Sequence, residues 1–333
     1  ITPSSKNNQQ THQMQLPKTQ STPFLKFISL HVAIISLVFQ SIIQSVFFTV
    51  PAALMISASS SFAAEITPDD PAINVYEHNN VNVIEINQQN GAGLSHNKFI
   101  DYNAITKDQT INNSAKDGNS QLAKAISGNS NFNGNEDLEA SKILFEVSGS
   151  SSRLEKNIEI FGRKADFILA NSKGIMCNGC GFINTSAVSF ITGNVVDASD
   201  PNNIKYQIDN DKNAAVLIDN GGITFYGNNN PDDDNNVELN LISRAVKIAG
   251  ELKVQNNAKL TKLNVRTGAG EFQRGTNSFT TNYQNSDADN IVNAGGSAGE
   301  LSDQGFAVVI DSTALGGVRA GQISIIATEE GAG

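Results

Sequence analysis

The sequence predicts an all-β fold that is assembled from many short strands. Runs of three to six β-favouring residues recur along the chain, and corners containing Asn and Gly separate them. No long segment with helical periodicity lies between the runs, and the composition includes 27 glycines and no tryptophan. A sandwich, a barrel and a β-solenoid all fit this pattern, and the runs alone do not separate these three architectures.

The overall charge argues against one class of partner. The chain of 333 residues has a formal net charge of −10 and no basic cluster. Because an acidic surface repels phosphate groups, no nucleic acid is expected as a partner.

The N-terminal region has the organisation of a signal peptide. Residues 1–23 carry Lys6 and Lys18 and no acidic residue, and residues 24–56 are dominated by Ile, Val, Leu and Phe. Small residues follow, and a cleavage before Ala64 would place Ser61 and Ala63 at the small positions of a processing site. We therefore expect an extended signal region at 1–63 and one domain at 64–333; a membrane-spanning helix is the alternative for the apolar stretch.

The first part of the expected domain contains short β-type runs around a polar insertion. Residues 115–140 are rich in Asn, Gly, Ser and Asp, so we expect a surface insertion with a short helix at 122–126. The runs are at 74–76, 81–86 and 143–147.

The most informative stretch is 157–193, where two turn signals separate short β-type runs. The runs are at 158–161, 166–170 and 181–191. The turns are Asn171-Ser172-Lys173-Gly174 and Cys177-Asn178-Gly179-Cys180. We expect Gly174 and Gly179 to adopt positive φ, and Asn171 to bond back to its own turn.

After residue 193 the same rhythm continues, interrupted by two polar segments. An acidic loop at 228–236 contains Asp232, Asp233 and Asp234, and residues 266–304 are expected to form a loop or a decorated turn. The expected runs are at 204–208, 214–218, 223–226, 237–242, 245–248, 252–254, 260–265, 307–310 and 322–327.

Two motifs resemble the haemagglutination-activity domain, the N-terminal secretion domain of two-partner secretion exoproteins such as filamentous haemagglutinin, haemolysins and contact-dependent toxins. The first motif matches at Ala165-Asp166, Ile168, Ala170-Asn171, Gly174-Ile175, Cys177 and 179–185, with Ser172 where the family usually has Pro. The second combines a G-x-S-H-N-x-F element at 93–99 with Asn112-Asn113-Ser114. The resemblance covers about residues 66–331, and it implies a right-handed parallel β-helix, a single elongated domain after the signal region.

The resemblance also implies candidate site residues. Each of them could contribute to recognition by a transporter or could simply shape a turn, and both interpretations stay open. The residues are Asn171, Gly174 and Ile175 in the first motif and Gly93, Ser95, His96 and Asn97 in the second.

Cys177 and Cys180 have four possible roles: a redox pair, half of a metal site, a disulfide, or free buried thiols. Zinc needs about four ligands, and His78 and His96 are the only histidines after residue 63. A thioredoxin-type site needs a helix after the motif, and Gly181-Phe182-Ile183 does not start one. A local disulfide suits the exported setting, and family members can carry one there.

No catalytic site, metal or cofactor is expected. Ser95 and His96 lack a nucleophile-elbow motif, and Asp232–Asp234 lack the spacing of a calcium loop, so we expect a structural histidine and a solvated loop. A β-helical polysaccharide lyase or hydrolase would need clustered carboxylates, whereas the acids here are scattered among loops. A self-contained surface adhesin is a further alternative.

The resemblance implies an export function. The domain of a large adhesin, haemolysin or contact-dependent toxin would cross the inner membrane and meet the POTRA domains of an outer-membrane β-barrel transporter in the periplasm. It would seed β-helix folding outside the cell, and the region beyond residue 333 would contact a host or neighbouring cell. We expect a secreted or cell-surface protein of a Gram-negative bacterium.

Overall fold

The chain forms stacked coils of short β-strands. The structure is a computed structural model that describes residues 65–209, 214–227, 234–280 and 320–327, all of them within the unit Phe62–Gly333. The expected signal region 1–63 and the expected run 307–310 lie outside the described residues. No helix in the part that the structure describes is long and apolar enough to cross a membrane.

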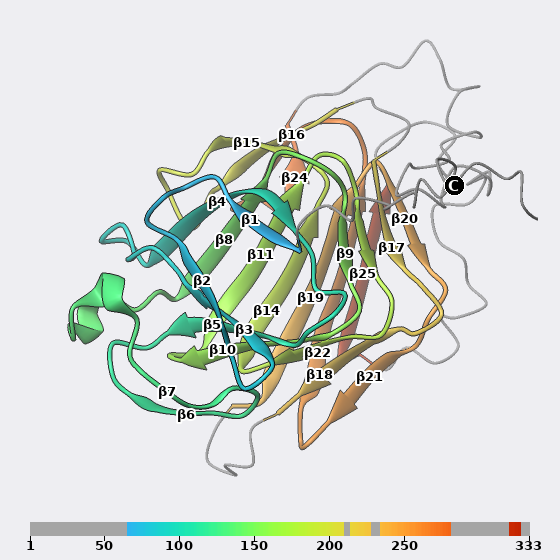
Figure 1. Cartoon of the computed structure of the whole chain (residues 1–333). Helices are drawn as coiled ribbons and strands as arrows, with labels where there is room; N and C mark the ends of the chain where they lie inside the picture. The colour runs from blue at the N-terminus through green and yellow to red at the C-terminus, as the bar shows by residue number, and fades with distance from the viewer. Residues whose placement is uncertain (1–64, 210–213, 228–233, 281–319, 328–333) are drawn as a thin grey trace, which may run out of the picture. The chain divides into compact units, whose positions relative to one another are not determined.

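One sheet, which we call the long sheet, contains eight strands (Figure 1). Neighbouring strands are parallel from β4 onward, whereas β1 pairs antiparallel with β4 at one edge. In sheet order the strands are β1 (Ile66–Pro68), β4 (Leu94–Tyr102), β8 (Lys142–Val147), β11 (Ala165–Asn171), β14 (Thr185–Ile191), β19 (Asn236–Ser243), β22 (Lys259–Thr267) and β25 (Gln322–Ala327).

Two further sheets complete the walls of the coils. The second sheet has the order β2 (Asn74–His78), β3 (Val81–Glu85), β5 (Gln109–Asn113), β10 (Asn157–Gly162), β13 (Cys180–Ile183), β18 (Ile223–Tyr226) and β21 (Leu252–Gln255). The third sheet has the order β20 (Ala245–Ile248), β17 (Ala215–Ile218), β12 (Ile175–Cys177) and β9 (Ser152–Leu154).

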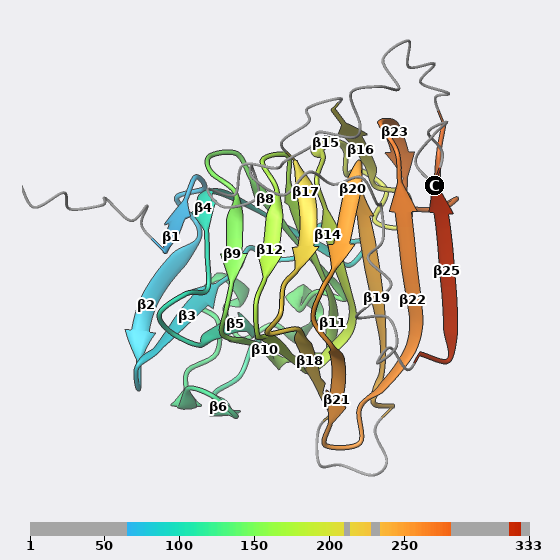
Figure 2. The ribbon, with the colours of Figure 1, turned by 90° about the vertical axis from the view of Figure 1, so that its right-hand side faces the viewer.

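The chain passes through the third, second and long sheets in turn and then repeats the circuit (Figure 2). Four circuits are β9–β10–β11, β12–β13–β14, β17–β18–β19 and β20–β21–β22. Each strand pairs in parallel with the equivalent strand of the next circuit. This arrangement is a parallel β-helix, so the predicted fold is confirmed.

Inward-facing side chains of successive coils stack on one another to form the core. Ring centroids of Phe99 and Phe145 are 4.6 Å apart, those of Phe145 and Phe167 are 5.4 Å apart, and those of Phe167 and Phe182 are 5.7 Å apart. These four side chains are fully buried. Because each ring is covered by the coils above and below it, a single coil could not bury its own core.

The corners of the central stretch differ in two places from the prediction. The expected run 181–191 is broken at Asn184, whose φ of 59° turns the chain from β13 into β14. Asn tolerates this left-handed conformation, and the Asn184 side chain donates to the carbonyls of Ile160 (2.7 Å) and Gly162 (3.1 Å). The short strand β12 (Ile175–Cys177) was not predicted, because only two residues separate the two expected turns.

The helix expected at 122–126 is wrong. The segment forms a turn followed by β7 (Lys124–Ile126), which pairs antiparallel with β6 (Gly118–Ser120). The buried Glu159 carboxylate accepts hydrogen bonds from Ser120 Oγ (2.6 Å) and from two backbone amides of the turn, so a distant residue decides the local conformation. Two 3-10 helices, η1 (Ser130–Phe132) and η2 (Glu136–Leu138), follow, and Phe132 is fully buried, so the insertion also contributes to the core.

An additional antiparallel sheet, the flanking sheet, covers part of the outer face of the long sheet. The sequence predicted only one strand of this sheet, at 204–208. The loop expected at 266–304 is wrong at 270–273 and 278–279, which form strands. Distant segments pair here, as Tyr206 lies opposite Phe272, and Ile168 and Ile191 of the long sheet pack beneath. The strands are β15 (Asn194–Asp197), β16 (Lys205–Ile208), β23 (Gly270–Gln273) and β24 (Ser278–Phe279).

Candidate functional site

The Asn171 turn ends β11 and carries the chain to β12. The Asn171 side-chain oxygen accepts from the backbone N–H of Lys173 (2.9 Å), and the Gly174 N–H donates to the Asn171 carbonyl (3.2 Å). Gly174 has φ of 113°, a conformation that residues with a Cβ rarely adopt. The turn therefore has the geometry that its Asn and Gly residues predict.

Asn171 also links two coils. Its side-chain amide donates to the Ser150 carbonyl and to Ser152 Oγ, both at 2.9 Å, and Asn171 is fully buried. The Ser152 N–H in turn donates to the Gly174 carbonyl (3.0 Å), and the buried Ile175 pairs with Ser152. The turn is thus tied to the preceding coil through both its side chain and its backbone.

Gly93 immediately precedes β4 and lies against the residues at the start of β8. Its φ is 94°, and its carbonyl accepts hydrogen bonds from the backbone N–H groups of Ser141 and Lys142, both at 3.0 Å. A Cβ at position 93 would collide with Ser141 Oγ. Glycine is required here by both conformation and space.

Ser95 and Asn97 point inward and form a buried polar network with Asn87. Ser95 Oγ donates to the Asn87 carbonyl (2.6 Å), and the Asn97 amide donates to Ser95 Oγ (2.9 Å). The Asn87 N–H closes the network by donating to Asn97 Oδ1 (2.9 Å). Both Ser95 and Asn97 are fully buried, so these residues shape the strand from inside and do not present side chains to a partner.

His96 points to the opposite face of β4 and pairs with Glu146 of β8. His96 Nε2 lies 2.7 Å from Glu146 Oε2, and Lys98 Nζ lies 4.0 Å from the same oxygen. The His96 side chain is 28% exposed. Among the seven candidate residues, His96 is the one with a polar side chain available at the surface.

The candidate residues of the two motifs occupy different positions along the same strands. Leu94 pairs with Lys142, which also pairs with Asp166 near the beginning of β11. Asn171 pairs with Val147, which pairs with Phe99, so Asn171 stands two register positions beyond Asn97. The structure therefore does not gather all seven candidate residues into one site: one group forms the turn after β11, and the other lies at and just before the first part of β4.

Cys177 and Cys180 form a disulfide across the corner between β12 and β13, with a Cα–Cα distance of 5.5 Å. Both residues are fully buried. Gly179 has φ of 82°, and its N–H donates to the Gly222 carbonyl of the next circuit (2.9 Å).

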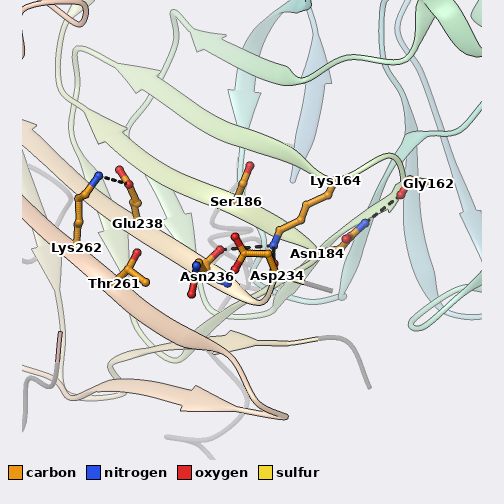
Figure 3. A pocket seen from close by; sticks show the side chains of 9 residues that line it. All are labelled: Gly162, Lys164, Asn184, Ser186, Asp234, Asn236, Glu238, Thr261 and Lys262. Carbon is orange, nitrogen blue, oxygen red and sulfur yellow. Dashed lines mark hydrogen bonds and ion pairs between the residues drawn. The ribbon is translucent and has the colours of Figure 1, made fainter. Parts of the chain in front are cut away.

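A polar cleft of about 780 Å³ lies over the strands β14, β19 and β22 (Figure 3). Its acidic groups are engaged: Glu238 pairs with Lys262 (2.6 Å), and Asp234 Oδ1 accepts from the Asn236 N–H (3.0 Å). Figure 3 shows Lys164 reaching toward Asp234 and Asn236, whose backbone carbonyls accept from its amine. Among the described residues that line it, the cleft does not present the pair of free carboxylates that glycoside hydrolysis uses.

Metal ligands are not assembled in the described ranges. No group of three or more His, Cys, Asp or Glu residues there could hold a metal ion. Asp232 and Asp233 lie outside the described residues.

Comparison with known proteins decides the family. The family model described as the TPS secretion domain matches residues 64–333. The chain belongs to the TPS secretion domain family. TPS denotes two-partner secretion, so the resemblance drawn from the two motifs is confirmed, and the chain is a secretion-targeting domain of the type found in large exported proteins.

Several curated relatives share most of this TPS secretion domain. Hemolysin of Serratia marcescens is 32% identical over 85% of this chain. The 16S rRNA endonuclease CdiA of Enterobacter cloacae is 36% identical over 81% of it, and filamentous hemagglutinin of Bordetella pertussis is 29% identical over 77%. The chain spans only 16%, 7% and 6% of these proteins, respectively, so their names describe much longer molecules.

A solved structure agrees with the fold. The crystal structure of the filamentous hemagglutinin secretion domain superposes with a TM-score of 0.61 at 26% identity and covers 80% of each chain. Both the family and this neighbour are secretion domains, which is the role of a targeting domain.

The sequence did not indicate the partners that hold the two corners. Ser152 lies 19 residues before Asn171, and Glu146 lies 50 residues after His96. No local pattern marks either residue, because each becomes a neighbour only when the coils stack.

Proposed function

We propose that a partner outer-membrane β-barrel transporter recognises this TPS secretion domain through periplasmic POTRA domains and exports it. The family match over residues 64–333 is the observation that carries the proposal. The signal region 1–63 would bring the chain across the inner membrane. The mature protein would be secreted or held at the surface of a Gram-negative cell.

The architecture suits a domain that also seeds folding. Each coil is stable only when a neighbour covers it, so a coil that emerges first provides the surface on which the next one stacks. At the last strand of the long sheet, β25, the side chains of Ile323, Ile325 and Ile326 are 45%, 44% and 47% exposed. An adhesin, haemolysin or toxin region that follows could extend this end and contact a host or neighbouring cell.

We propose the turn at Asn171, Gly174 and Ile175 as the primary element on which transporter recognition depends. The side chains of Asn171 and Ile175 are buried, so through these residues a partner can meet only the backbone shape that they hold. During export, before β14 and β17 have stacked on them, β11 and β12 would offer open edges to which an extended transporter segment could add by backbone hydrogen bonding. The segment of Gly93, Ser95, His96 and Asn97 at the start of β4 is a second candidate, where His96 can contribute a side-chain contact.

A secretion assay with a matched asparagine tests this proposal. Asn171→Ala removes two donated hydrogen bonds to the preceding coil and the bond accepted from the Lys173 N–H, which costs about 1–3 kcal/mol. Asn129→Ala is the control, because Asn129 lies outside both motifs and its buried side chain also donates two bonds, to the carbonyls of Ile86 and Asn112, and accepts one, from the Asn131 N–H. With the transporter co-expressed, we expect release into the medium to fall strongly for Asn171→Ala and Gly174→Val, while Asn129→Ala is exported at a level set by its stability alone.

Each outcome is informative. If export is the same with and without the transporter, the two-partner mechanism is wrong for this chain. If export depends on the transporter but Asn171→Ala and Asn129→Ala reduce it equally at equal stability, the Asn171 turn is a structural corner and not a recognition element.

A further inference from the structure

The last described circuit of the β-helix has two sheet edges without a described partner. The long sheet continues to β25, which pairs in parallel with β22, whereas the described strands of the third and second sheets end at β20 and β21. Val254 of β21 stands in register with the inward-facing Phe225, yet Val254 is 43% exposed and Phe225 is fully buried. Among the described residues, the circuit that ends in β25 therefore has no strand in the other two sheets.

The segment 307–310, which lies outside the described residues, has the sequence of a third-sheet strand. It reads Ala-Val-Val-Ile, whereas β17 reads Ala-Val-Leu-Ile and β20 reads Ala-Val-Lys-Ile. In β17 and β20 the second and fourth residues point inward and are fully buried, and the pairing aligns the two strands residue by residue. In the aligned sequence, Val308 and Ile310 stand at the second and fourth positions.

The spacing along the chain matches as well. In three described circuits, a third-sheet residue precedes the register-equivalent inward residue of the second sheet by 7 positions (Ile175 to Phe182), 9 positions (Val216 to Phe225) and 8 positions (Val246 to Val254). Val308 precedes Leu315 by 7 positions.

The distance to the long sheet agrees too. Ile175 precedes Ala187 by 12 positions, Val216 precedes Glu238 by 22 and Val246 precedes Lys262 by 16, where Ala187, Glu238 and Lys262 stand in register. Val308 precedes Gln322, the register partner of Lys262, by 14 positions.

We propose that residues 307–315 of this same chain complete the last circuit. In this arrangement 307–310 pair in parallel with β20, and Leu315 covers Val254 at the edge of β21. The edge offered to any following chain is then formed by this added coil together with β25, and not by β20 and β21.

Engineered cysteines test both the occupant and the register. Lys247 alternates with the inward-facing Val246 and Ile248, and Val309 would lie beside it on the next strand. Neighbouring strands lie about 4.8 Å apart, within the Cα separation that a disulfide spans. The full chain with Lys247→Cys and Val309→Cys should form an intramolecular cross-link, detected by mass spectrometry without reductant. The chain with Lys247→Cys and Val308→Cys is the control and should not, because position 308 faces inward.

The contrary results are equally clear. The proposal is overturned if the intramolecular cross-link forms in equal yield in both variants, if it forms in neither folded variant, or if a cross-link forms only between two chains. A second measurement does not depend on new cysteines: Val308→Asp should lower the urea midpoint of unfolding, and Val309→Asp should leave it near that of the parent chain. Equal midpoints for these two variants would also contradict the proposed coil, and neither readout depends on export.

Discussion

Glu65 shows how a single side chain anchors the start of this domain. Its carboxylate accepts hydrogen bonds from the backbone N–H groups of Ile105 (2.7 Å) and Thr106 (2.9 Å) and from Thr106 Oγ1 (2.5 Å). Burial by itself raises the pKa of Glu65, but the hydrogen bonds from Thr106, Ile105 and Lys107 outweigh it, and the net pKa is below the ordinary value of 4.5. The charged form is therefore favoured by folding.

This shift predicts a pH-dependent contribution to stability. A carboxyl group whose pKa is lower in the folded than in the unfolded state stabilises the fold at pH values above its unfolded-state pKa. This stabilisation is lost as the pH falls through the folded-state pKa. We expect Glu65→Gln to lower the melting temperature at pH 7, and the difference from the parent chain to shrink as the pH falls below about 4.5. Thermal melts of both chains from pH 7 to pH 3 measure this difference in melting temperature. Glu77→Gln, at an exposed ion pair with Lys107, should have little effect at any pH, and a pH-independent loss for Glu65→Gln would contradict the argument.

The β12–β13 corner is the element at which covalent and hydrogen-bonded links meet. Its disulfide closes a loop with only two residues between the cysteines, so the chain entropy that it removes is small, and replacing both cysteines should cost about 2 kcal/mol or less. We expect exported protein to show no free thiol by mass spectrometry without reductant. The Cys177→Ala/Cys180→Ala variant should retain the β-rich circular dichroism spectrum with a modestly lower urea midpoint. Quantitative alkylation of both residues in folded exported protein would show that they are free thiols.

For the whole molecule, the division between signal region and domain makes a prediction about processing. Cleavage before Ala64 would leave Glu65 as the second residue of the mature chain, and the family match also begins at residue 64. N-terminal sequencing of exported protein should therefore read Ala-Glu-Ile-Thr. Ala63→Leu should block or shift this cleavage because the position before the cut must be small, whereas Phe62→Leu, at the unconstrained position between Ser61 and Ala63, should not. A mature chain that still carries residues 24–56 would contradict the signal-peptide interpretation.

The local structure of this protein and its family could be predicted from the sequence. Short β-favouring runs and turns such as Asn171–Gly174 reflect local conformational preferences, and the positive φ of Gly174 could be predicted from residue type. The match to two motifs then identified a parallel β-helix and an export function. Which distant residues meet depends on the tertiary structure: the hydrogen bonds of Glu159 hold a hairpin where a helix was expected, and β16 pairs with β23 in the flanking sheet. The tertiary structure also places Gly93 and Asn171 at different positions along neighbouring strands. Bonds within a turn, such as that from Lys173 to Asn171, follow from the local sequence. A single coil of a β-helix cannot cover its own core, however, so the contacts that tie a corner to the rest of the fold come from a neighbouring coil or a more distant segment of the chain.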